Sequence, residues 1–441
     1  MSQPDDFDNV DPVPPPPLDL ARWRKLPGQL MAGGGLIAVI GAVAGYLRHG
    51  NLLEFGYSWL LAFMFFLSIA LGAMFLVLMH HLFDAGWSVA TRRFSEHLAA
   101  LTFPWLAILF IPIALLAPKI YPWMTSDPHT DHALHAKLPM FTFTGFYLIA
   151  AVCFLAWWAV SNRLRYWSLK QDEDGSARCT IKMRLHACWG IWAFGVTLTL
   201  AAIMWMKALQ HQWFSTMYAV IYFAGSAWLA LATVYVITLV LDRQRILTDV
   251  LHEHQFYFLG SLMFAFTVFY AYVHFAQYFI IWNANMPEET FWYVVREYNA
   301  QGQRSTWFLI GLVIIFGHFF LPFLALLRID VKHTFSIMVP LCAWAGLMHF
   351  VDLSFNILPV RHPEGFPFKW FWLPLGCLTF MGGLLSMVFL KSFASAAPFP
   401  QKDPRLIEAM GLYHPVPTQI SGGELDQTDD MRGAPIRPGG H

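Results

Sequence analysis

The chain is predicted to be an all-α integral membrane protein with about ten transmembrane helices. Two observations support this prediction. Hydrophobic residues make up 57% of the 441 residues and charged residues only 13%, whereas about 25% of a typical soluble protein is charged. In addition, apolar runs of about 20 residues, the length that crosses a bilayer as a helix, recur along the chain.

Ten such runs lie between two tails. The N-terminal tail, residues 1–27, is acidic and proline-rich, unlike the basic start of a secretory signal, and is predicted to be disordered. The C-terminal tail, residues 394–441, is rich in Pro and Gly and is predicted to be extended or disordered. The first run contains GGGLIAVIGAVAG, whose small residues suit close helix packing. The predicted spans are 28–48, 56–83, 97–118, 139–161, 187–208, 215–241, 255–281, 305–327, 335–358 and 368–393.

The positions of Lys and Arg predict that both termini are cytoplasmic. If the N-terminus is inside, 20 of the 28 Lys and Arg residues fall on the cytoplasmic side and 8 on the other side. Basic residues concentrate on the cytoplasmic side of membrane proteins. The long loop 162–186 is then inside, and the long loops 119–138 and 282–304 are outside.

The seventh run carries a polar stripe on an otherwise apolar helix. In YAYVHFAQYFIIW (270–282), Tyr270, His274, Gln277 and Tyr278 lie at i, i+4, i+7 and i+8 and share one face. Such a face is expected to point toward protein or water rather than toward lipid. We therefore predict that it meets the eighth and ninth runs, and that Tyr270 and Gln277 orient His274 by hydrogen bonding.

Ionisable residues in the apolar runs fall into two sets at different depths. A charge at the centre of the bilayer costs on the order of 3 kcal/mol on insertion scales. His and Asp can avoid this cost by changing protonation or by pairing, and a series of such groups is what proton conduction requires. His349 and Asp352, one helical turn apart, are the strongest candidates. The predicted outer path is His349, Asp352, His274 and Lys207; the predicted inner path is His80, His81, Asp84 and Glu253; and His318 is predicted to link them.

Structural interpretations of the same residues stay open. Terminal groups such as His80 and Lys207 can simply extend to the lipid headgroups, and His274 fits a hydrogen-bonded core histidine equally well. No metal site is predicted, because the H-x-x-H-x-x-H spacing at 129–135 is a weak pattern on an exposed loop. The five scattered cysteines exclude covalently bound haem and iron–sulfur clusters. Equal numbers of basic and acidic residues, 28 each, give no indication of nucleic-acid binding.

Four stretches resemble one particular membrane-protein family. AGWSVATRR (85–93), HQWFSTMYAVIYFAGS (211–226), GSLMFAFTVFYAYVHFAQYFIIWNANMPEETFWY (260–293) and GHFFLPFLALL (317–327) are similar to the ActF-type, NrfD/PsrC-like subunit of bacterial alternative complex III, a quinol:cytochrome c oxidoreductase. This subunit is also called quinone-binding subunit 2. The resemblance covers most of residues 55–360, and the chain departs from it in the approach to the fourth run (HALHAKLPMFTFTGF).

The resemblance implies an NrfD-like fold and a place in a respiratory complex. The expected fold is two four-helix bundles, approximately 56–208 and 215–358, with the first and last helices peripheral. The expected location is the bacterial inner membrane. Expected partners are a multihaem cytochrome c subunit, an iron–sulfur subunit, a sister NrfD-like subunit, small membrane subunits and a terminal oxidase. The resemblance also implies proton half-channels and a site for menaquinone or ubiquinone, without a redox centre in this chain.

Two other functions are compatible with the sequence. A stand-alone secondary transporter would use the same intramembrane polar groups, and prolines do interrupt several runs, although mostly near helix ends. A purely structural anchor of the complex would need those groups only to satisfy one another. The enzyme-complex subunit is the prediction, and these two are the alternatives.

Overall fold

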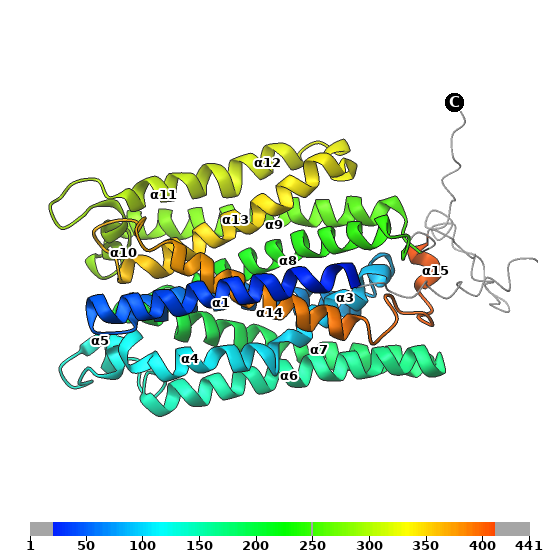
Figure 1. Ribbon diagram of the computed structural model, residues 1–441, viewed down its shortest axis with the longest axis horizontal. Coiled ribbons are helices and arrows are strands. Elements are labelled where there is room, and N and C mark those ends of the chain that lie inside the picture. The colour runs from blue at the N-terminus through cyan, green and yellow to red at the C-terminus, as the bar shows by residue number, and fades with distance from the viewer. Residues whose placement is uncertain (1–20, 248–249, 411–441) are drawn as a thin grey trace, which may run out of the picture.

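The computed structural model describes residues 21–247 and 250–410 and is helical throughout, with no strand in those ranges (Figure 1). Ten of the described helical segments are long and apolar enough to cross a membrane. This confirms the predicted all-α integral membrane fold with about ten spans. The helices run back and forth along one axis. We call the end that carries the start of α1 (Ala21–His49) and α15 (Leu406–Ala409) the terminal end, and the end that carries α5 (His132–His135) and α10 (Pro287–Glu297) the loop end.

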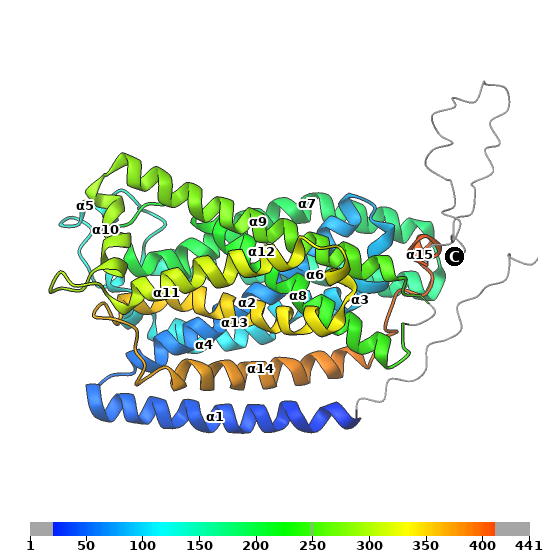
Figure 2. The same cartoon turned by 90° about the horizontal axis from the view of Figure 1, so that it is seen from above.

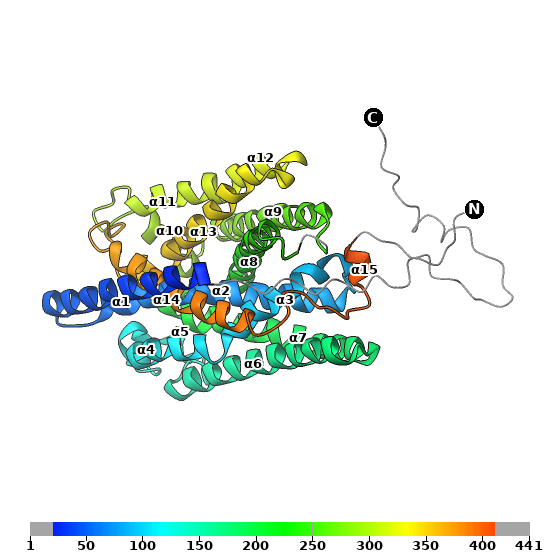
Figure 3. The same ribbon diagram turned by 45° about the vertical axis from the view of Figure 1, so that its right-hand side comes forward.

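The spans form two groups that meet along two central helices (Figure 3). The central helices are α2 (Leu53–Leu82) and α8 (Tyr218–Arg243). Gly72 lies directly against the backbone of Ser226, so a side chain larger than hydrogen would not fit there. The Tyr222 hydroxyl donates a hydrogen bond to the Met64 carbonyl at 2.9 Å. The other members of the first group are α3 (Val89–Ala99), α4 (Trp105–Ile120), α6 (Phe143–Asp174) and α7 (Ala177–Ala201); those of the second are α9 (Glu253–Ala284), α11 (Thr306–Ile314), α12 (Leu321–Leu326) and α13 (Phe335–Ile357).

The first and last spans pack on each other at one side of these groups (Figure 2). They are α1 and α14 (Trp372–Phe393). Gly34 of α1 faces the backbone of Phe380, and Gly383 of α14 faces the backbone of Met31. The small residues of the first run therefore permit close helix packing, as the sequence predicted.

Three stretches that the sequence assigned to loops or tails are helical or packed. Helices α6 and α7 extend through most of 162–186 and turn only at Gly175, which has φ +65. The predicted loop 282–304 contains the amphipathic helix α10. Residues 394–410, which we call the C-terminal strap, fold back onto the terminal end and bury Phe399, Asp403 and Leu406. Hydropathy finds apolar runs, and it missed these stretches because polar contacts hold them in place.

Candidate functional site

A pocket with a volume of about 680 Å³ opens beside the second group of helices. Its walls come from α9, α10, α11, α13 and η6 (Ile315–Phe320), a π-helical stretch that joins α11 to α12. Aromatic and aliphatic side chains make up most of the wall. The polar or charged side chains in the wall are Tyr270, His274, Tyr293, Arg296, Glu297 and Asp352, with Tyr272 and Tyr278 adding further phenols.

Three predicted residues come together here: Tyr270 and His274 line the pocket, and His318 packs against Tyr270. The ring of Tyr270 lies 4.2 Å from the ring of His274 and 3.8 Å from that of His318, measured between centroids. His318 also packs 4.2 Å from the ring of Trp228 of α8. His318 lies in the π-helical η6, a type of irregularity common at functional sites. The expected meeting of the seventh and eighth runs is therefore present.

Asp352 and His349 of α13 have different surroundings. Asp352 lines the pocket, is 4% exposed and accepts a hydrogen bond from Asn356 Nδ2 at 3.3 Å. His349 is not among the pocket-lining residues; it is buried next to Gly225 of α8, with its ring 5.8 Å from that of Phe65. The i, i+3 spacing placed both groups inside the protein, but it did not bring them into one contact.

Several polar atoms here have no hydrogen-bond partner among the described residues. They are the Tyr270 hydroxyl, His274 Nε2 and both ring nitrogens of His318 and of His349. Burying an unpaired polar atom costs roughly 1–3 kcal/mol. Unpaired atoms beside a pocket therefore indicate a place where water or a ligand would be bound.

The predicted role of Gln277 is wrong, because this side chain hydrogen-bonds elsewhere. Gln277 Oε1 accepts a hydrogen bond from Ser215 Oγ at 2.6 Å, and Gln277 Nε2 donates to the Tyr293 hydroxyl at 3.2 Å. Gln277 therefore orients Tyr293 rather than His274. Tyr270 contacts His274 through its ring, with its hydroxyl unpaired within the described ranges. Burial raises the pKa of Tyr293 to about 12, so its hydroxyl stays protonated and can donate into the pocket.

Lys207 is not brought to the outer set. It lies at the loop end of the first group in η5 (Lys207–Gln210), with its Nζ 5.7 Å from the ring of Phe214. Its neighbour Lys137 donates to the carbonyl oxygen of His211, and burial lowers the pKa of Lys137. Lys207 is not among the residues that line the pocket.

Arg296 is a functional candidate that the sequence did not single out. Its guanidinium carbon lies 3.4 Å from the ring centroid of Trp292. It donates hydrogen bonds to the carbonyls of Phe355, Asn356 and Trp292 at 3.0, 3.2 and 2.8 Å. Burial lowers the pKa of Arg296 to about 9. In the sequence, Arg296 is only a basic residue near the end of an amphipathic segment. In the structure, its positive charge lies next to the carbonyl groups at the C-terminal end of α13, a position that favours a cation.

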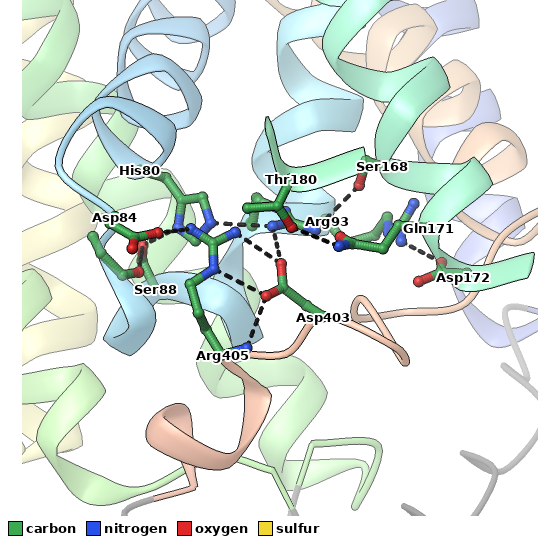
Figure 4. A network of polar contacts seen from close by, with 12 residues as sticks. His80, Asp84, Ser88, Arg93, Ser168, Gln171, Asp172, Thr180, Asp403 and Arg405 are labelled. Carbon is green, nitrogen blue, oxygen red and sulfur yellow. Dashed lines mark hydrogen bonds and ion pairs between the residues drawn. The ribbon is translucent and has the colours of Figure 1, made fainter. Parts of the chain in front are cut away.

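The terminal end carries a second cluster, which is dominated by ion pairs (Figure 4). Arg92 and Arg93 of α3 have no exposed side-chain surface. Arg92 pairs with Asp403 at 2.5 Å and with Glu96 at 3.1 Å, and Arg93 pairs with Asp172. The charge of Arg92 and the hydrogen bonds of Arg405 outweigh burial, which acts in the opposite direction, and hold the pKa of Asp403 well below its ordinary value.

The predicted inner-path residues lie in or beside this cluster. His80 contacts Ser88 at 2.7 Å and Arg92 at 3.1 Å, and the His81 ring lies 4.8 Å from that of His80. Asp84 is half-exposed and pairs with Arg184 and Arg405 at 2.5 and 2.7 Å. The fourth residue of that set, Glu253, has a side chain outside the described part of the structure. Asp403 escaped prediction because it comes from the C-terminal strap, 311 residues after Arg92.

An aromatic layer separates the two polar clusters. Phe75 of α2 lies 4.8 Å from Phe223 of α8 and 6.0 Å from Phe266 of α9, between ring centroids. Phe266 precedes Tyr270 by one helical turn, and Phe75 precedes His80 by somewhat more than one. His318 contacts the rings of Trp228 and Tyr270, and its described ring contacts do not extend to His80. The predicted link through His318 is therefore not continuous in this conformation.

Comparison of the chain with protein-family models and with curated proteins finds no match. Among the described residues, no group of three or more His, Cys, Asp or Glu side chains is arranged to hold a metal ion.

Proposed function

We propose that this chain is an integral membrane subunit of a respiratory quinol:cytochrome c oxidoreductase, or of a related quinol:acceptor complex. In this proposal it lies in the bacterial inner membrane with both termini in the cytoplasm. It provides a quinone site and part of a proton path, and it carries no redox centre of its own. The observation that carries the proposal is the pocket lined by Tyr270, His274, Tyr293 and Asp352.

The residues of the pocket fit a quinone. A quinone has a planar ring with two carbonyl oxygens and an apolar tail, so it needs hydrogen-bond donors within aromatic walls. Tyr293 has a hydroxyl proton that its bond from Gln277 leaves free, and the Tyr270 hydroxyl lies beside the Asp352 carboxyl in the pocket wall. These two phenols would hold the headgroup, and Phe275, Phe319 and Phe320 would surround the tail. When bound, the quinone supplies two-electron, two-proton chemistry.

The chain's own residues suit proton transfer beside such a ring. Asp352 lines the same pocket as Tyr270 and His274, so a proton leaving the headgroup has a carboxylate and an imidazole within the site. His318 and His349 extend this set inward. The Phe75–Phe223–Phe266 layer then separates it from the His80 cluster, an arrangement that suits two half-channels rather than one open pore.

Purification from native membranes tests the complex. A tagged chain should copurify with haem absorbance and with extractable quinone. A chain that purifies alone, without haem, would be the transporter alternative and would refute membership of the complex.

Replacement of Asp352 tests the proton path. Asp352→Asn should leave assembly intact and lower the proton-to-electron ratio in sealed vesicles, because the carboxylate that accepts protons is gone. Asp242→Asn, a carboxylate change near the terminal end of α8, is the matched control and should leave the ratio unchanged. An unchanged ratio in Asp352→Asn would favour the structural-anchor alternative.

A further inference from the structure

The hydrogen bonds around His80 select one tautomer of its ring. The Ser88 hydroxyl donates its proton to the Ala85 carbonyl at 3.0 Å. With that proton committed, Ser88 Oγ can only accept at its 2.7 Å contact with His80 Nδ1. The ring proton of His80 therefore lies on Nδ1, and Nε2 carries a lone pair.

That lone pair faces a group that can only donate. Arg92 Nη1 lies 3.1 Å from His80 Nε2, and a guanidinium has donors but no acceptor. The lone pair accepts the Arg92 proton, which leaves no position on Nε2 for a second one. In this conformation His80 is a neutral histidine that cannot bind a proton until Arg92 moves.

Arg92 is held in this position by Glu96 of its own helix and by the C-terminal strap. Its Nη1 donates to Asp403 Oδ2 at 2.5 Å, so one nitrogen serves both Asp403 and His80. Asp403 is in turn fixed by Arg405, whose Nε and Nη2 donate to the two carboxylate oxygens at 3.0 and 2.9 Å. Figure 4 shows Asp403 and Arg405 next to His80 and Ser88.

The strap is attached to several elements. Gln255 Nε2 of α9 donates to the Ala409 carbonyl at 2.6 Å. The backbone amide of Gln401 donates to Asp172 of α6 at 3.0 Å, and Lys402 Nζ donates to the Glu173 carbonyl at 2.7 Å. These bonds hold the strap in place, and with it Asp403 beside Arg92.

The other charged and titratable groups near His80 belong to four elements. Those on α2 and in the turn after it are His81 and Asp84; α3 contributes Arg92 and Glu96; α7 contributes Arg184; and the strap contributes Asp403, Arg405 and Glu408. From α8 and α9, the residues that line the pocket beside His80 are apolar: Val234, Leu259, Leu262 and Phe266. Within the described structure, the Arg92 guanidinium is the group that contacts His80 Nε2. Arg92 therefore controls whether His80 Nε2 can bind a proton.

We propose that Asp403 is a positioning residue that acts through Arg92 to keep His80 neutral, and that displacement of the C-terminal strap frees His80 Nε2 to take a proton. The strap is thus a latch on the terminal-end cluster. The tautomer assignment is independent of the proposed function, whereas its effect on proton transfer rests on that function.

Nitrogen NMR of the intact complex tests the latch. With ¹⁵N-labelled histidine, the His80 signals are identified by their loss in His80→Gln. The wild-type protein should show a protonated Nδ1 and an unprotonated Nε2 at all values between about pH 5 and pH 8, where an ordinary histidine titrates. In the double variant Asp403→Ala/Arg405→Gln, which removes one negative and one positive charge together with the acceptor that holds Arg92, Nε2 should become protonated toward the acid end of this range. The matched control is Asp330→Asn, which removes a carboxylate paired with Arg328 on the exposed surface, and should keep the wild-type signals.

An Nε2 that stays unprotonated through pH 5 in Asp403→Ala/Arg405→Gln would overturn the latch. If that variant does not assemble, Ser88→Ala decides the tautomer: without Oγ the Nδ1 signal must move, and an unchanged signal overturns the assignment. Proton-to-electron ratios measured on the same samples separate the two proposals. If Asp403→Ala/Arg405→Gln frees His80 while the ratio and its pH profile stay unchanged, the latch is supported and the place of His80 in a proton path fails.

Discussion

Replacement of Arg296 should be more damaging with lysine than with methionine. Arg296 makes three hydrogen bonds to buried carbonyls, which contribute about 1.5 kcal/mol each as charge-assisted bonds. Its stacking on Trp292 contributes about 2 kcal/mol more at a desolvated site. Against these gains, burial lowers the pKa of Arg296 to about 9, which corresponds to a desolvation cost on the order of 5 kcal/mol.

The two substitutions remove different parts of this balance. Methionine loses the bonds and the stacking but also removes the buried charge, so the net loss of stability should be about 1.5 kcal/mol. Lysine keeps a charge that needs solvation but offers a point donor in place of a planar fork, so it should lose about 3 kcal/mol. Both changes should loosen α10 from α13 at the wall of the pocket.

Thermal unfolding of the purified protein measures this order. The midpoint should fall in the sequence wild type, Arg296→Met, Arg296→Lys. Arg304 is exposed at the same end and stacks on Phe308 at 4.1 Å, so Arg304→Met and Arg304→Lys should both stay within about 0.5 kcal/mol of wild type. If Arg296→Lys is milder than Arg296→Met, the charge itself is stabilising and the reasoning fails.

Two further predictions concern the loop end and the helix contact at the centre. His362 contacts Glu54 at 3.0 Å; burial lowers its pKa, but the hydrogen bond and charge of Glu54 outweigh burial, and the net pKa is raised above 6.5. The stabilising contribution of the His362–Glu54 contact is therefore complete below pH 6.5 and is lost as the pH rises through the higher pKa of the folded state. The thermal unfolding midpoint should fall over this pH range. His362→Gln should abolish this fall, whereas the control His129→Gln, at an exposed position, should still show it. Gly72→Ala should destabilise the protein by roughly 1–3 kcal/mol because a methyl group cannot fit against Ser226. The control Gly195→Ala, at a position with open space around it, should not destabilise the protein. Equal unfolding midpoints for the two variants would contradict the proposed α2–α8 contact.

Much of the architecture follows from local properties of the chain. Apolar runs of sufficient length account for the ten spans, since a bilayer demands that every backbone polar group be paired within its own helix. Small residues in 28–48 indicated a closely packed helix, and Gly34 does lie against α14. The i, i+4 spacing of Tyr270 and His274 likewise placed both on one face, where their rings meet.

Contacts between distant parts of the chain could not be obtained in this way. Gln277 had the right spacing to serve His274, but the position of α10 gave it Tyr293 as a partner instead. Lys207 had the right depth but belongs to the other group of helices. Spacing along one helix describes which residues share a face, and it says nothing about which neighbour that face meets.

The terminal-end cluster shows most clearly that contacts between distant residues cannot be predicted from spacing along one helix. The apolar pattern alone is sufficient to predict a ten-span helical membrane protein, because hydrophobicity and helical period act over a few residues. The pairing of Arg92 with Asp403, and with it the state of His80, arises from folding of the C-terminal strap onto α3. A buried ion pair forms wherever the fold brings opposite charges out of water together, and its partners carry no signal of each other in the order of residues.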